Sequence, residues 1–183
     1  MTTKKTFVSS ERKRLTMVKA ELSTYLEQVW NKEKGYWCAS SSSGVFHRFF
    51  GRDGAVICDD LLDTFRFEKD SALRHLYLER AQKHYAFEEN YLGKVVNPIS
   101  DEEPGKVPHE IRPSGEIWYT SVDATPLSIT VFSRLLFLSG KEGREELLAR
   151  HEKSLRQKAK YLENARTERG YLGYRYTGVM TNK

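Results

Sequence analysis

Residues 125–140 read TPLSITVFSRLLFLSG, and this stretch carries the clearest helix signals in the chain. Thr125 is a good N-cap, Pro126 suits the first helical position, and Gly140 follows the last apolar residues as a stop signal. Between these signals, apolar residues recur at helical spacing: Leu127, Val131, Phe132, Leu135, Leu136 and Leu138. We therefore expect the most deeply buried helix of the protein here.

The same spacing predicts four more helices. They are expected at residues 10–31, from 53 or 54 to before 68, at 70–89 and at 142–163, followed by an extended segment at 170–176. Val56 is expected to point inward from the second of these helices. The inward face of the last is expected to carry Leu148, His151, Leu155, Ala159 and Leu162. Long helices alternating with long loops predict an all-α fold of helical hairpins side by side, with short β-like segments in the loops.

The composition is that of an ordinary globular protein with one domain. The chain has 183 residues, of which 39% are hydrophobic and 30% are charged. Its net charge of +5 raises nucleic acid as a partner, but basic and acidic residues alternate in the predicted helix 142–163, as on a solvated helix face. We therefore expect no nucleic-acid partner.

Membrane, metal and cofactor chemistry are not indicated. No apolar run approaches the ~20 residues of a membrane-spanning helix. No apolar secretion signal follows the basic N-terminus, so we expect a cytoplasmic protein with no membrane partner. Cys38 and Cys58 lack metal-ligand spacing and are expected to be reduced core thiols, with His151 also in the core. No metal or other cofactor is predicted.

Three turn-rich stretches carry the candidate chemistry. They read FGRDG at residues 50–54, EEPGKVPHEIR at 102–112 and SVDATPL at 121–127. The connection 90–123 holds four of the five prolines, and so long a connection is usually functional. Arginine and carboxylate side chains hydrogen-bond neighbouring hydroxyl groups, while aromatic faces cover the apolar side of a sugar ring. We therefore interpret these stretches as walls of a sugar pocket.

The sequence also leaves structural explanations open for each candidate. Asp53 is equally suited to cap a helix, with Arg52 exposed beside it, and Asp123 stands at a helix entrance where the helix dipole favours a carboxylate. The acidic loop is also consistent with a solvated surface. Trp118 and Tyr119 are consistent with a core position, although their place among acidic loop residues favours a sugar-stacking platform.

The motifs resemble those of one enzyme family. FGRD at 50–53, EPGKVPHEIR at 103–112 and YTSVDATPL at 119–127 are similar, in order, to motifs of glycogen-debranching-type amylo-alpha-1,6-glucosidases and their glucoamylase-like relatives. The resemblance spans roughly residues 46–140. It implies part of an (α/α)6 toroid and inverting hydrolysis of alpha-glucans by a six-hairpin glycosidase without metal or organic cofactor. The substrate-binding residues that it implies are Arg52, Asp53, His109, Glu110, Arg112, Trp118, Tyr119 and Asp123.

The resemblance also implies where the catalytic acid lies. Residues 170–183 look like the family's approach to the segment that supplies the general acid, which would follow Lys183. We therefore expect residues 1–183 to be a single partial (α/α)6 domain, truncated at its C-terminus, with catalytic residues unassigned and no activity alone. Such a piece is expected to self-associate. Two alternatives stay open, a non-catalytic carbohydrate-binding remnant and a helical-hairpin protein-interaction module.

Overall fold

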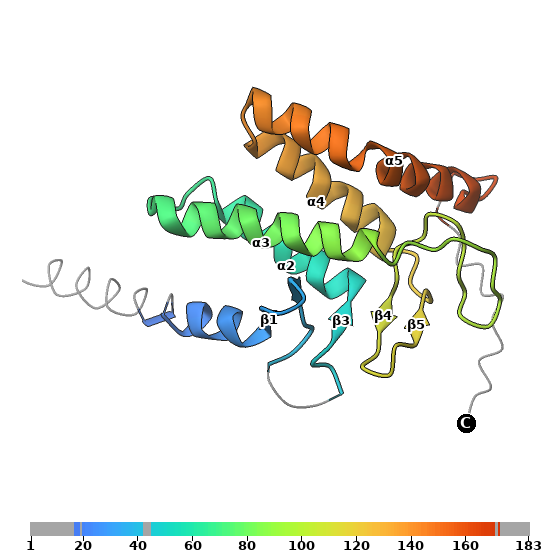
Figure 1. The fold of residues 1–183 in the computed structure, drawn as a ribbon, viewed down its shortest axis with the longest axis horizontal. Helices are drawn as coiled ribbons and strands as arrows, with labels where there is room; N and C mark the ends of the chain where they lie inside the picture. Colours follow the sequence, from blue (N-terminus) through green and yellow to red (C-terminus); the bar gives the residue numbers. More distant parts are fainter. Residues whose placement is uncertain (1–16, 19, 42–44, 171, 173–183) are drawn as a thin grey trace, which may run out of the picture.

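Most of the described chain is helical in the computed structural model, which describes residues 17, 18, 20–41, 45–170 and 172 (Figure 1). A helical segment ends at Val29. The later helices are α2 (Gly51–Thr64), α3 (Ser71–Glu89), α4 (Ala124–Leu138) and α5 (Lys141–Ala165). The predicted mostly helical class is therefore confirmed. The start of the first predicted helix and most of the segment 170–176 lie outside the described residues.

Two small antiparallel sheets connect the helices. One pairs β1 (Trp30–Asn31) with β2 (Tyr36–Trp37). The other has the order β3-β4-β5, formed by β3 (Phe49–Phe50), β4 (Glu110–Ile111) and β5 (Ile117–Trp118). The first helix ends two residues earlier than predicted, because residues 30 and 31 pair with β2 instead of continuing the helix.

Helices α2 and α4 lie side by side and run in the same direction. At their first residues, a Cβ built on Gly51 would lie 3.4 Å from the Cβ of Ala124. Further along both helices, Arg134 of α4 forms ion pairs with Asp59 and Asp63 of α2. The N-terminal ends of both helices therefore meet at the three-stranded sheet (Figure 1).

Helix α3 returns antiparallel to α2. Its start lies at the end of α2, where the Arg74 guanidinium lies over the Phe65 ring. Its later part lies at the start of α2, where Gly54 leaves room for the His84 ring. The Asp70 side chain caps α3 by accepting hydrogen bonds from the backbone of residues 72 and 73.

The start of α4 differs from the prediction. Asp123 occupies the N-cap position and Thr125 lies inside the first turn, where its hydroxyl accepts a hydrogen bond of 3.0 Å from the Val107 backbone. Pro126 is the third helical residue rather than the first. This position is tolerated because backbone N–H groups of the first turn have no acceptor within the helix.

The buried face of α5 is rotated from the predicted one. His151 is buried as expected, but Leu148 is 39% exposed. The buried residues of this helix are Leu147, His151, Lys158, Tyr161 and Ala165. Lys158 is buried because its ammonium lies 2.6 Å from Glu88 Oε1 and 2.7 Å from Ser128 Oγ. A periodicity of apolar residues cannot detect such a buried ion pair.

The main core lies between the helices and the β1–β2 hairpin. It includes Trp37, Leu62, Tyr85, Phe132 and Leu135. Cys38 and Cys58 are both buried free thiols, as predicted. Val56 is 43% exposed, so its predicted inward orientation is wrong. The side of α2 that packs on α3 and α4 instead carries residues 54, 55, 58, 61 and 62.

Candidate functional site

The three sequence motifs meet at the sheet β3-β4-β5. In its register, Phe50 pairs with Glu110, and Glu110 pairs with Trp118. The Gly51 backbone N–H donates to the His109 carbonyl at 3.0 Å, and the His109 N–H donates to the Trp118 carbonyl at 2.7 Å. Backbone pairing therefore brings together residues that are about sixty positions apart in the sequence.

The sheet lies directly against the first turns of α2 and α4. A Cβ built on Gly51 would lie only 2.2 Å from the Pro108 carbonyl oxygen, so a side chain cannot fit without displacing the segment 107–109 that precedes β4. Because both helices begin here, their N-terminal dipoles point to the same place. The ends of these helices therefore favour electronegative groups at the sheet.

Glu110 lies between two arginines. Its Oε1 atom is 2.5 Å from Nη2 of Arg48 and 3.3 Å from Nε of Arg112. Arg112 also pairs with Glu116 at 3.0 Å. The Glu110 side chain is only 10% exposed, whereas Arg112 and Glu116 reach the surface. The sequence predicted Glu110 and Arg112 but missed Arg48, which comes just before β3.

Charged residues from all three motifs act electrostatically on His109. Burial lowers the pKa of His109, and the charges that act on it next belong to Glu110, Arg52, Asp53 and Asp123. The imidazole also contacts Phe50 edge-on, with ring centroids 5.6 Å apart. The four charged residues are therefore close enough to act on one imidazole rather than lying on separate parts of the molecule.

Arg52 and Asp53 form the exposed side of this group. Their charged atoms are 3.6 Å apart, and half of the Arg52 side chain is exposed. Asp53 lies in the first turn of α2, where the helix dipole alone would favour it. Asp123 accepts a hydrogen bond from the Ser121 hydroxyl. Both carboxylates thus have structural roles as well as a place at the candidate site.

Three buried polar atoms near the sheet have no hydrogen-bond partner among the described residues. They are Arg48 Nε, His109 Nδ1 and Trp118 Nε1. Buried polar atoms are normally paired, so an unpaired group calls for an explanation such as a ligand or a water molecule. Three such atoms on neighbouring residues indicate a place where a polar ligand would complete the hydrogen bonding.

The predicted aromatic platform is arranged differently from expectation. Tyr119 is 4% exposed and donates its hydroxyl hydrogen bond to the Tyr91 carbonyl, which places its ring in the core. The Arg112 guanidinium lies over the Trp118 ring, 5.3 Å from its centroid. The exposed aromatic ring here is Phe46, which is 57% exposed and packs on Phe50. Sequence reasoning missed Phe46 because its surroundings read only as an irregular loop.

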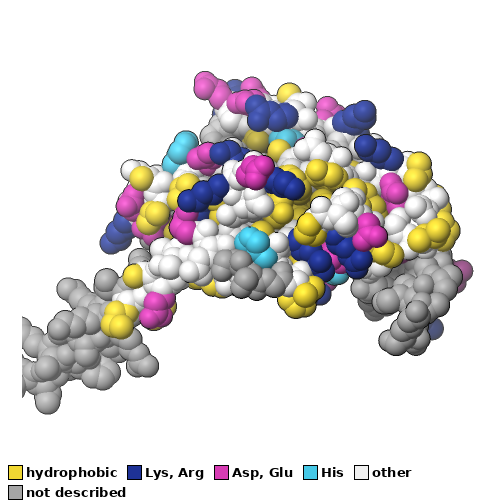
Figure 2. Space-filling model, turned by 60° about the horizontal axis from the view of Figure 1, so that its bottom comes forward, with side chains coloured by type: hydrophobic (Ala, Val, Ile, Leu, Met, Phe, Trp, Pro, Cys, Tyr) yellow, Lys and Arg dark blue, Asp and Glu magenta, His cyan; other side chains and the backbone are white. Residues whose placement is uncertain are grey.

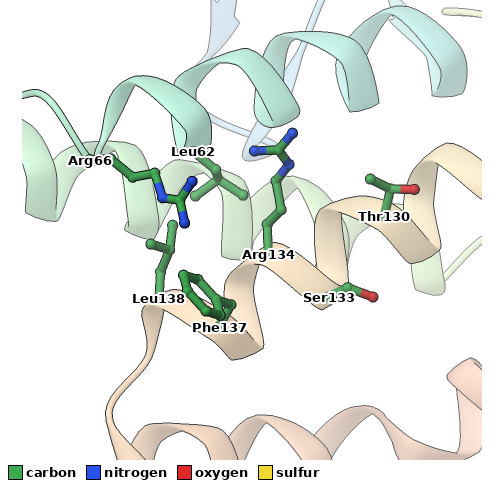
Figure 3. Close-up of a pocket in the computed structure, with 7 residues that line it drawn as sticks. All are labelled: Leu62, Arg66, Thr130, Ser133, Arg134, Phe137 and Leu138. Atoms are coloured by element: carbon green, nitrogen blue, oxygen red, sulfur yellow. The ribbon is translucent and has the colours of Figure 1, made fainter.

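A second feature lies at the opposite end of α2 and α4. A hollow of about 270 Å³ is lined by Leu62 of α2, by Arg66 just after α2, and by Phe137 and Leu138 of α4 (Figure 3). The Arg66 guanidinium lies over the Phe137 ring, which is 66% exposed. This α2–α4 groove contains none of the residues predicted to bind sugar.

The surface charge is mixed. Figure 2 shows basic and acidic side chains intermingled on the face that it presents.

Within the described part of the chain, no cluster of three or more metal-ligating side chains occurs. In the same part, no helix combines the length and apolarity needed to cross a bilayer. Comparisons with protein-family models, with curated proteins and with solved structures found no match to this chain.

Proposed function

We propose that this chain carries the sugar-binding site of an inverting alpha-glucan hydrolase of the glycogen-debranching, amylo-alpha-1,6-glucosidase type. The observation that carries the proposal is the convergence around His109 of charged residues from three separate motifs, next to three unpaired buried polar atoms. Parallel α2 and α4, each followed by an antiparallel helix, are the arrangement that one sector of an (α/α)6 toroid would need. The proposed ligand is a terminal glucosyl unit.

The geometry suits the recognition of a neutral polyol. Arginine and carboxylate groups offer donors and acceptors at fixed positions, and these match vicinal hydroxyl groups on a sugar ring. Arg52 and Asp53 are exposed enough to reach a ligand, whereas Glu110 is held by two guanidinium groups and orients them. The exposed ring of Phe46 would cover the apolar face of the sugar.

The proposed roles are in binding rather than in proton transfer. Inversion needs a carboxylic acid and a carboxylate base about 6.5–9.5 Å apart, on opposite sides of the scissile bond. Asp53, Glu110 and Asp123 surround the same imidazole and are proposed to line one sugar subsite. The general acid and base are not assigned to described residues, and an alpha-glucan is the proposed partner.

Glycogen-affinity electrophoresis tests this proposal. The wild-type chain should be retarded in a gel that contains glycogen, and Arg52→Ala should lose most of the retardation because charged hydrogen bonds contribute about 1.5–3 kcal/mol each. Arg66→Ala is a matched control, since Arg66 is an exposed arginine beyond the other end of α2. Equal retardation of the wild type and Arg52→Ala, or none of the wild type, would refute the sugar site.

Self-association is a second candidate function, favoured by the α2–α4 groove. Phe137 exposes two thirds of its side chain beside Leu62 and Leu138, and a large exposed aromatic group next to an apolar hollow is typical of an interaction surface. Such a groove would be the contact surface in a helical-hairpin interaction module, and equally in an incomplete toroid that self-associates. Sedimentation, described below, separates this candidate from a purely monomeric sugar-binding protein.

A further inference from the structure

Another hollow, of about 310 Å³, lies between α5 and the turn that follows α3. Three cationic side chains line it, Lys94 from the turn and Arg150 and Lys153 from α5. Ser154 and Gln157 add a hydroxyl and an amide to the same lining. We call this the basic hollow.

The basic hollow carries a net positive charge. The ammonium groups of Lys94 and Lys153 have no ion pair or hydrogen bond with other described residues, and Arg150 uses one nitrogen to pair with Glu146 at 2.6 Å. The lining contains one carboxylate, Glu89. Its Oε2 is 2.5 Å from Nδ1 of His151, and its Oε1 accepts from the Ser154 hydroxyl. The Glu89 carboxylate is therefore already bound by two side chains of α5.

Backbone packing fixes the position of Lys94 against α5. The carbonyl of Gly93 accepts from the Gly105 N–H at 2.9 Å, and the Lys94 N–H donates to Glu102 Oε1 at 2.8 Å. Gly105 has a φ of +84°, and a Cβ there would lie 2.1 Å from the Gln157 carbonyl. Only glycine allows this contact between the turn and α5. The lysine on the turn and the cations on α5 thus face a common space.

We propose that the basic hollow binds the phosphoryl group of a small phosphate monoester. Several cations that approach from two elements, with the Gln157 amide beside them, suit a tetrahedral dianion with several acceptor oxygens better than a carboxylate with two. The volume of the basic hollow exceeds that of a phosphate ion, so it also has room for the small polar group esterified to the phosphate. This inference does not depend on the proposed sugar site. Leu92, buried in the wall of the hollow, packs with Val107 and Ala124 behind that site.

Isothermal titration of the full chain with inorganic phosphate at constant ionic strength tests the proposal. The wild type should bind one phosphate saturably. Lys94→Ala/Lys153→Ala should bind at least about tenfold more weakly, because it removes two of the three cationic groups that line the hollow. Lys94→Arg/Lys153→Arg should retain binding because it keeps both charges.

The matched control is Lys69→Ala/Lys141→Ala, which removes the same net charge from exposed positions outside the hollow. It should bind phosphate as the wild type does. Equal weakening in both double variants would show that only the overall charge matters and would overturn the proposal. Failure of the wild type to bind phosphate saturably would overturn it as well. Glycogen retardation measured on the same variants should be unchanged, which keeps this test separate from that of the sugar site.

Discussion

Gly51 and Ala124 begin two parallel helices in direct contact: a Cβ built on Gly51 would lie 3.4 Å from the Cβ of Ala124. The same Cβ would lie 2.2 Å from the Pro108 carbonyl, which is bonded into the segment that carries His109 and Glu110. One glycine therefore allows the two helix starts and the motif-bearing strand to share one place.

Gly51→Ala should lower the free energy of unfolding by about 1–3 kcal/mol, the usual cost of overpacking. It should also weaken glycogen binding, because the segment that carries His109 must move. Urea unfolding measures the first effect and gel retardation the second. Gly140→Ala is the control, since a Cβ there would meet no atom within 4 Å. Equal stability of the two alanine variants would contradict the close packing at Gly51.

Phe46→Ala should weaken maltooligosaccharide binding by about two- to tenfold, since aromatic stacking contributes about 0.5–1.5 kcal/mol. The physical reason is the exposed Phe46 ring, which packs on Phe50, while Phe50 in turn contacts His109. Phe67→Ala is the matched control, because Phe67 is 79% exposed and follows the far end of α2. A chemical-shift titration with maltotriose would measure the binding affinity of each variant. An equal loss in both variants would assign the effect to general surface hydrophobicity.

Phe137→Ser should reduce self-association through the α2–α4 groove. Removing the exposed ring removes the largest apolar group of that surface, so the sedimentation coefficient of the variant should shift toward the monomer at concentrations where the wild type associates. Val96→Ser, at an exposed residue of the 94–103 loop, is the control and should sediment as the wild type does. A monomeric wild type would refute the groove as a homotypic interface.

Most of the helices were predictable because their apolar spacing and end signals are local properties of the sequence. The helix predicted at 70–89, observed as α3 at Ser71–Glu89, and the long connection without a long helix are examples. The strands were predictable only as short irregular segments. Each has two residues, too few for an alternating pattern, and β3 pairs with residues about sixty positions later.

The sequence motifs of the candidate site could be predicted, but the contacts between their residues could not. Arg48 joins Glu110 only through the long-range β3–β4 pairing, and Tyr119 enters the core because its hydroxyl finds the Tyr91 carbonyl. The buried face of α5 was missed for a similar reason. Lys158 looks like a surface residue in the sequence, and its partners Glu88 and Ser128 come from two other helices.

Lys158→Met should lower the free energy of unfolding by about 3–5 kcal/mol, because it leaves the buried Glu88 carboxylate without its cation. Adding Glu88→Gln should recover part of the loss, since the amide can still hydrogen-bond Ser128. Urea denaturation would measure both variants. Lys160→Met, at an exposed position on the same helix, should change stability by less than about 0.5 kcal/mol. If Lys158→Met were equally mild, the buried ion pair would not exist.

The free energy of unfolding should decrease as the pH drops, in part because of His84. Burial, assisted by the charge of Lys158, lowers the pKa of His84 from 6.5 to about 3. The ring stacks on Phe49, and its Nδ1 accepts a hydrogen bond from the Trp37 N–H. Between pH 6.5 and about 3, His84 binds a proton more readily in the unfolded chain than in the folded protein, so its protonation favours unfolding. The stabilising contribution is complete above the unfolded pKa and decreases as the pH falls below it.

Between pH 7.5 and 5.5, this one residue should remove about 1.4 kcal/mol from the free energy of unfolding. His84→Asn keeps an acceptor near the Trp37 N–H but does not titrate, so it should be less stable at pH 7.5 and yet lose less stability over this interval than the wild type. Urea unfolding at the two pH values measures the difference. His75→Asn, at an exposed histidine, should follow the wild-type dependence. Parallel pH profiles for His84→Asn and the wild type would show that the pKa of His84 is the same in the folded and unfolded states.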